Sequence, residues 1–266
     1  MTAPLPGAIA ALLYLLAAAA QLGVLQGRLS IPRSWPIAAG LIAVLLHLVA
    51  VSLQMGTPAG VDLGIYHMGS ATLAVVAAIA VASSTRNAAE NLFIGLFPLA
   101  TLALAASLLL ESPYDPHPLA TGIVAHVLLS VIAYSMLATA ALQGVLLALQ
   151  DRMLRRHDLS VLRRLPPLQA MERLLFEFLG SGMVFLTSSI ITGFVFLDDF
   201  SVGGLIHHTV ITCAAWIVFA ILIWGRYRLG WRGAIASRWT LSGFALLLTG
   251  YFGSKMVMEL ILGPQV

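Results

Sequence analysis

Eight apolar stretches, each close to 20 residues long, recur along the whole chain and constrain its fold more than any other feature. A helix needs about 20 residues to cross a hydrocarbon core of roughly 30 Å, so each stretch predicts one transmembrane helix. We place the predicted helices at residues 5–25, 36–55, 66–83, 91–110, 122–149, 179–197, 205–225 and 239–261. Little sequence remains outside them. We therefore expect an all-α membrane protein, with a single bundle of eight transmembrane helices forming one domain over residues 1–266.

The composition excludes a soluble domain. Hydrophobic residues make up 60% of the 266 positions and charged residues only 9%, too few to cover a water-exposed surface. The first ten residues carry no basic residue ahead of the first apolar run, so we expect no cleaved signal peptide. A single cysteine, Cys213, rules out an internal disulfide and a CxxC thiol motif.

The arginines predict the orientation of the chain. Every arginine falls in alternate connections, near residues 26–35, 84–90, 150–178 and 226–238. The other connections hold acidic residues and no Lys or Arg. By the positive-inside rule the arginine-rich side is cytoplasmic, and both termini lie on the outer, periplasmic side.

The basic connection 150–178 is best interpreted as a topology signal that rests on anionic lipid headgroups. Its leucine spacing predicts a short amphipathic helix in the interface, broken by Pro166 and Pro167. Because no aromatic residues are interleaved with the arginines, we expect no binding of nucleic acid.

Six of the seven histidines belong to the outer half of the predicted bundle, and only His157 lies in a cytoplasmic connection. His67 and His117 are near water, where histidine is common. His47 and His126 lie within hydrocarbon, where a polar ring needs a partner and often marks a functional path. His207 and His208 begin the predicted seventh helix.

Polar residues share faces with two of these histidines. His126, Ser130 and Tyr134 are spaced at i, i+4 and i+8, which predicts one polar stripe along a helix. His208 and Thr212 share a face in the same way. Close packing explains small residues on such faces, but it does not explain imidazoles.

Two uses of these imidazoles remain open. Two neutral imidazoles from different helices can clamp a haem iron. Alternatively, the histidines and the outer carboxylates of Asp62, Asp115, Asp198 and Asp199 could hold zinc or copper, although no HxxH or HExxH motif is present. Motifs for hydrolysis and for nucleotide binding are absent too.

Lys255 is the only basic residue outside the arginine-rich connections. It can pair with Glu259 one turn later in the same helix. It can also neutralise an anionic group on a ligand, such as a haem propionate, because no arginine is expected on that side.

Three segments carry a resemblance to a known family. HVLLSVIAYSMLATAALQGVLLALQD, RRLPPLQAMERLLFEFLGSGMVFLTSSIITGFVF and AAWIVFAILIWGRYRLGWRGAIASRWTLSGFALLLTGYFGSK resemble the CcsA-like membrane core of the cytochrome c assembly protein family, in particular its short YpjD/HemX-like branch. The resemblance covers the four C-terminal helices. In the four N-terminal helices it is limited to the layout and the position of His47.

The resemblance implies a multi-pass protein of the bacterial inner membrane that binds or handles haem b during cytochrome c assembly. Other cytochrome-assembly proteins are then its candidate partners, besides haem and membrane lipid. The family's histidine before an SxxxY pattern matches His126. Larger members present haem with a tryptophan-rich WWD loop, whereas the equivalent stretch here, FLDDFSVGGLIHH, has no tryptophan. We therefore expect no haem lyase activity.

Taken together, these patterns predict haem b near the outer side of the bundle. His126 and His47 are the first candidates for iron ligands, and His208 or His207 is the next. Ser130, Tyr134 and Lys255 are expected to line the site. The alternatives are a membrane scaffold or regulator without cofactor, and a protein that binds a divalent metal.

The orientation can be tested with reporter fusions. A fusion within residues 150–178 should report a cytoplasmic location, and a fusion within residues 111–121 should report a periplasmic one. A periplasmic signal from residues 150–178 would reverse the orientation and every depth inferred from it.

Overall fold

The computed structural model describes residues 3–111, 114–155, 165–196 and 205–261, without the side chains of residues 205–207 and 260. Within this part of the chain, eight helices are long and apolar enough to cross a membrane. The protein is thus a multi-pass membrane protein, as predicted. The chain divides into two compact units, residues 1–118 with 156–166 and residues 119–155 with 167–266. The expected single bundle of all eight helices stays a prediction.

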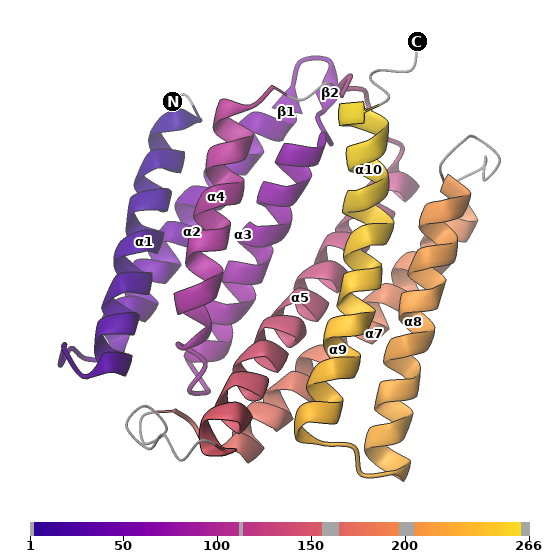
Figure 1. Cartoon of the computed structure of the whole chain (residues 1–266). Helices are drawn as coiled ribbons and strands as arrows, with labels where there is room; N and C mark the ends of the chain where they lie inside the picture. Colours follow the sequence, from indigo (N-terminus) through magenta and orange to yellow (C-terminus); the bar gives the residue numbers. More distant parts are fainter. Residues whose placement is uncertain (1–2, 112–113, 156–164, 197–204, 262–266) are drawn as a thin grey trace. The chain divides into compact units, whose positions relative to one another are not determined.

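The N-terminal unit contains four spanning helices and one small hairpin (Figure 1). The helices are α1 (Pro4–Gln26), α2 (Ser34–Met55), α3 (Ile65–Ser84) and α4 (Leu92–Leu109), and the hairpin strands are β1 (Gly56–Thr57) and β2 (Gly60–Val61). Both α1 and α3 pack against α2 and against α4. This arrangement brings the apolar faces of all four helices into one core.

Aromatic rings fill the centre of that core. The Phe93 and Phe97 rings are stacked with centroids 4.4 Å apart, and the Tyr14 ring lies 4.8 Å from that of Phe97. All three side chains are fully buried. Transmembrane helices associate through such close packing, because the hydrophobic effect does not drive apolar helices together when lipid already surrounds them.

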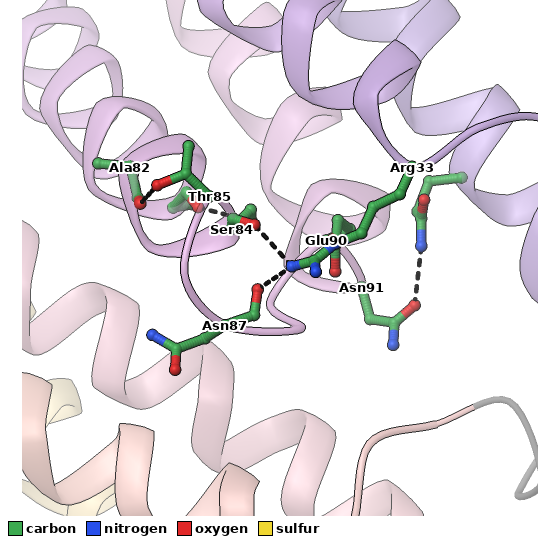
Figure 2. Close-up of polar contacts among 9 residues, drawn as sticks. Arg33, Ala82, Ser84, Thr85, Asn87, Glu90 and Asn91 are labelled. Carbon is green, nitrogen blue, oxygen red and sulfur yellow. Dashed lines mark hydrogen bonds and ion pairs between the residues drawn. The ribbon is translucent and has the colours of Figure 1, made fainter.

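Arg33 joins the two connections at the arginine-rich end of this unit (Figure 2). Its guanidinium donates to the Ser84 carbonyl at 2.6 Å and to the Asn87 carbonyl, and it pairs with the Glu90 carboxylate. Glu90 is only 6% exposed. A buried carboxylate needs such a partner, so this cluster stabilises the turn between α3 and α4.

At the opposite end, the hairpin is fixed by the chain that follows α4. Val61 N–H donates to the His117 carbonyl at 3.1 Å. Asp62 accepts from Gly64 N–H at 2.8 Å, and its other carboxylate oxygen lies 3.1 Å from His67 Nδ1. The Asp62 carboxylate therefore satisfies a backbone donor at the start of α3.

The C-terminal unit contains the other four spanning helices. They are α5 (Thr121–Arg155), α7 (Leu168–Phe196), α8 (Leu205–Arg228) and a last span that starts with α9 (Gly233–Leu248). The last span continues as a π-helix, η1 (Thr249–Gly253), then as α10 (Ser254–Met256) and as a second π-helix, η2 (Val257–Ile261). Both α5 and α8 pack against α7 and α9.

Glu172 of α7 connects three helices of this unit at its arginine-rich end. One carboxylate oxygen accepts from Gly233 N–H, the start of α9, at 2.6 Å. The other lies 3.8 Å from Arg226 of α8, whose guanidinium stacks 4.6 Å above the Phe176 ring. Gly233 has a φ of +52°, a conformation that favours glycine.

The spans agree with the predicted ones except around residues 150–178 and at the C-terminus. Helix α5 continues to Arg155 and α7 begins at Leu168, so both extend beyond their apolar stretches. The ion pairs Asp151–Arg155 and Arg173–Glu177 support these polar turns. Much of the predicted interfacial helix lies in residues 156–164, outside the described residues. The last span begins at Gly233, six residues before its predicted start, and changes to π-helix after Leu248.

Arg33→Ala should destabilise the protein by roughly 2–4 kcal/mol, because the buried Glu90 carboxylate loses its partner. The double variant Arg33→Ala/Glu90→Ala should lose less stability than the single variant. Arg28→Ala, at an exposed arginine of the same connection, should change the stability little. Reversible unfolding in mixed detergent micelles measures the differences. Equal losses in the single and double variants would contradict the pairing.

Candidate functional site

His126 lies in the first turns of α5 and faces α7. Its Nδ1 is 2.9 Å from the Ser189 carbonyl oxygen of α7. Ser130 donates to the His126 carbonyl at 2.7 Å, and the Ser130 and Ser189 hydroxyl oxygens are 2.6 Å apart. The predicted stripe of His126 and Ser130 is thus confirmed as one hydrogen-bonded group, and Ser189 completes it.

The partner of His126 Nδ1 determines which nitrogen carries the proton. A carbonyl oxygen only accepts, so Nδ1 must be the N–H donor in this bond. In a neutral imidazole Nε2 then keeps its lone pair. This tautomer, with Nδ1–H held by a carbonyl, is the usual form of a histidine that binds metal through Nε2.

His208 in α8 supplies the second imidazole of this unit. Its Nε2 is buried and has no hydrogen-bond partner among the residues that the structure describes. Thr212, one turn later on the same helix and 7% exposed, also has a buried hydroxyl oxygen without a partner. His126 in α5 and His208 in α8 both belong to the C-terminal unit. The shared face predicted for His208 and Thr212 therefore carries two buried polar atoms that the protein leaves unsatisfied.

Two tyrosines lie beside this pair of imidazoles. The Tyr134 hydroxyl donates to the Leu247 carbonyl of α9 at 2.8 Å. The Tyr251 ring from η1 lies 5.8 Å from the His208 ring and 5.5 Å from the Tyr134 ring. Tyr251 thus connects His208 of α8 with Tyr134 of α5 through ring contacts.

His47 has a different environment, in the N-terminal unit. It is fully buried, with Nε2 2.9 Å from the Ser70 hydroxyl and Nδ1 3.3 Å from the Tyr14 hydroxyl. Both ring nitrogens therefore have partners within the protein, on α3 and on α1. To bind iron, His47 would have to break one of these bonds. This arrangement favours a structural role for His47 over the ligand role predicted first.

Lys255 pairs with Glu259, as one of its two predicted interpretations requires. The side chains are 16% and 11% exposed. The side chains of His207, Asp198 and Asp199 lie outside the described part of the structure, as does His157. His67 bonds to Asp62, and His117 is exposed near Tyr114.

For the described residues, no group of three or more His, Cys, Asp or Glu side chains is arranged to hold a metal ion. The predicted alternative of a divalent metal also involves Asp198 and Asp199, which lie outside these residues. Two imidazoles are the number of protein ligands that an iron already held by four porphyrin nitrogens can take.

Comparison with known proteins gives the family. The sequence profile of the cytochrome c assembly proteins matches residues 35–262. The chain belongs to the cytochrome c assembly protein family. The match extends from α2 into the last span, so it covers more than the second half of the chain, where the resemblance is strongest in the sequence.

Two curated relatives extend this result. The chain is 30% identical over 204 residues to an "Inner membrane protein YpjD" of Escherichia coli, covering 76% of the chain and 78% of that protein. It is 32% identical over 142 residues to an "Uncharacterized 28.8 kDa protein in nifR3-like 5'region" of Azospirillum brasilense, covering 52% of each. No solved structure matches the chain significantly.

Sequence reasoning missed two members of the site. Ser189 of α7 was not among the predicted site residues, yet it bonds to His126 and Ser130. Gly182, Ser189 and Gly193 are all buried, and the spacing of these small residues in the sequence could have indicated the packed face of α7. Tyr251 was missed because the π-helix changes the face on which it lies.

Proposed function

We propose that this member of the cytochrome c assembly family binds haem b between His126 and His208 of its C-terminal unit. The observation that supports the proposal is the pair of ring nitrogens. Hydrogen bonding to Ser189 leaves His126 Nε2 with a lone pair, and His208 Nε2 is buried without a partner. Family membership supports the same conclusion, because cytochromes c carry haem.

In this proposal the residues of the site have distinct roles. His126 and His208 hold the iron, and the Ser189 carbonyl orients the His126 ring. The rings of Tyr134 and Tyr251 exclude water beside His208. When bound, haem supplies an iron that can change its oxidation state. Alternatively, the bound haem could be cargo that the protein passes on to a cytochrome.

The proposed role is haem handling during cytochrome c assembly in the bacterial inner membrane. The relative named an inner membrane protein and the eight spanning helices support this location. Without a tryptophan-rich loop between α7 and α8, we propose no haem lyase activity. Lipid, haem and other cytochrome-assembly proteins are the proposed partners.

A reduced-minus-oxidised spectrum of the detergent-purified protein tests the proposal. The wild type should show the bands of haem b, and His126→Ala and His208→Ala should each abolish or shift them, because each variant removes one imidazole that would hold the iron. His117→Ala, at an exposed histidine, is the matched control. Normal haem content in both the His126 and His208 variants would exclude this pair of ligands.

The same experiment decides the role of His47. His47→Ala should lower the stability of the protein, since Tyr14 and Ser70 lose their partner, while any haem that is retained keeps its normal bands. Altered bands would restore His47 as an iron ligand. A wild-type protein without a Soret band would favour the cofactor-free scaffold.

Lys255 provides a separate test of an anionic ligand. If its ammonium group neutralises a haem propionate, Lys255→Met should weaken haem retention more than Glu259→Gln, because only the lysine carries the positive charge. Haem dissociation into excess apomyoglobin measures the difference. Equal effects would assign the two residues to a structural ion pair alone.

A further inference from the structure

The last transmembrane span changes its hydrogen-bond register beside His208. Helix α9 ends at Leu248, and the π-helix η1 covers Thr249–Gly253. A π-helix closes its bonds from i to i+5 and is rare except as short segments, many of them at functional sites. The change of register rotates the following residues around the helix axis. It therefore determines the direction in which Tyr251 points.

The Tyr134 hydroxyl supports the start of this π segment. A change from α to π bonding displaces carbonyls from their α-helical donors, and a buried carbonyl without a donor is unfavourable. The Leu247 carbonyl, two residues before η1, accepts the Tyr134 hydroxyl at 2.8 Å. Tyr134 is 6% exposed and Leu247 is fully buried, so water does not replace this bond.

Tyr251 carries the effect of the π segment to His208. Its ring lies 5.5 Å from the Tyr134 ring and 5.8 Å from the His208 ring, which it meets at 69°. Near-perpendicular contacts of this kind are favourable because the positive edge of one ring faces the negative face of the other. The imidazole is therefore packed against a ring that η1 places.

A close approach of the backbones holds η1 against α8. A Cβ on Gly250 would lie 3.1 Å from the Ile211 side chain and 3.7 Å from the Thr212 hydroxyl. A Cβ at this distance would require the Ile211 side chain to move by a few tenths of an ångström. The contact lies within one turn of His208, on the helix that carries it.

We infer that Tyr134 and Tyr251 are positioning residues for His208, and that the Tyr134 hydroxyl fixes the π segment that holds the imidazole in place. The inference rests on the proposed function, because the positioned nitrogen is a proposed iron ligand. The position of the ring is nevertheless a property of the protein alone. It can be measured without haem.

Modification of His208 by diethylpyrocarbonate, followed by mass spectrometry of the cofactor-free full chain in lipid nanodiscs, measures how firmly the ring is held. Tyr134→Phe should raise the modification rate at least about fivefold, the population change expected when one buried hydrogen bond is lost. Tyr14→Phe removes an equally buried hydroxyl in the other unit and should leave His208 unchanged. A rate for Tyr134→Phe equal to that of the wild type would overturn the inference.

A second variant covers the case in which Tyr134→Phe does not fold. Tyr251→Leu should expose His208 in the same way, whereas Phe219→Leu, which removes a buried ring packed on Gly243 of α9, should not. Equal exposure of His208 in both variants would mean general loosening of the unit and would overturn the inference.

The spectrum of the haem-loaded protein separates this inference from the proposed function. Both tyrosine variants should shift the electron paramagnetic resonance g-values of low-spin ferric haem, because these values report the orientation of the axial imidazoles. Absence of haem from the wild type would refute the proposed function and leave the modification result standing. Bound haem with unchanged g-values and unchanged modification would refute the positioning alone.

Discussion

The hydrogen bond from His126 Nδ1 to the Ser189 carbonyl is the interaction on which the candidate site depends. Hydrocarbon offers no water to satisfy a polar ring, so the bond must come from another helix. The Ser189 carbonyl accepts a hydrogen bond from the imidazole. This bond fixes the contact of α5 with α7, and it also fixes the plane and the tautomer of the ring. Ser130 and Ser189 strengthen the same contact through their hydroxyl groups. The other ring nitrogen, His126 Nε2, is directed away from α7 and can bind a ligand.

The two units use buried imidazoles in opposite ways. In the N-terminal unit, His47 bonds to Tyr14 and to Ser70, so it joins α1, α2 and α3 and leaves no nitrogen available. In the C-terminal unit, His208 has a buried nitrogen without a partner. Depth in the membrane ranked His47 above His208 as a candidate ligand, whereas the hydrogen bonds of the ring nitrogens favour His208.

The sequence predicts the parts of this protein that depend on local periodicity. The length of the apolar stretches predicts all eight spans, and the i, i+4 spacing predicts that His126 and Ser130 share a face. The contact of Ser189 with His126 depends on the rotation of α7, which packing sets through contacts such as that of Gly182 with Leu137. The π-helix depends on Tyr134, which is 113 residues away from its partner Leu247. No pattern within the last span contains that information, because a propensity acts over a few neighbouring residues.

An unsatisfied imidazole also bears on the choice between a haem protein and a scaffold. A buried polar atom without a partner destabilises a fold by about 1–3 kcal/mol, and two such atoms lie one turn apart on α8, at His208 and Thr212. A scaffold would gain nothing from either atom, since leucine at both positions would pack in hydrocarbon without this loss. A ligand that bonds to His208 recovers it. A ring nitrogen that has no partner among the described residues needs its position fixed by packing. The Tyr251 ring, which η1 carries and which packs against Tyr134, supplies that packing for His208.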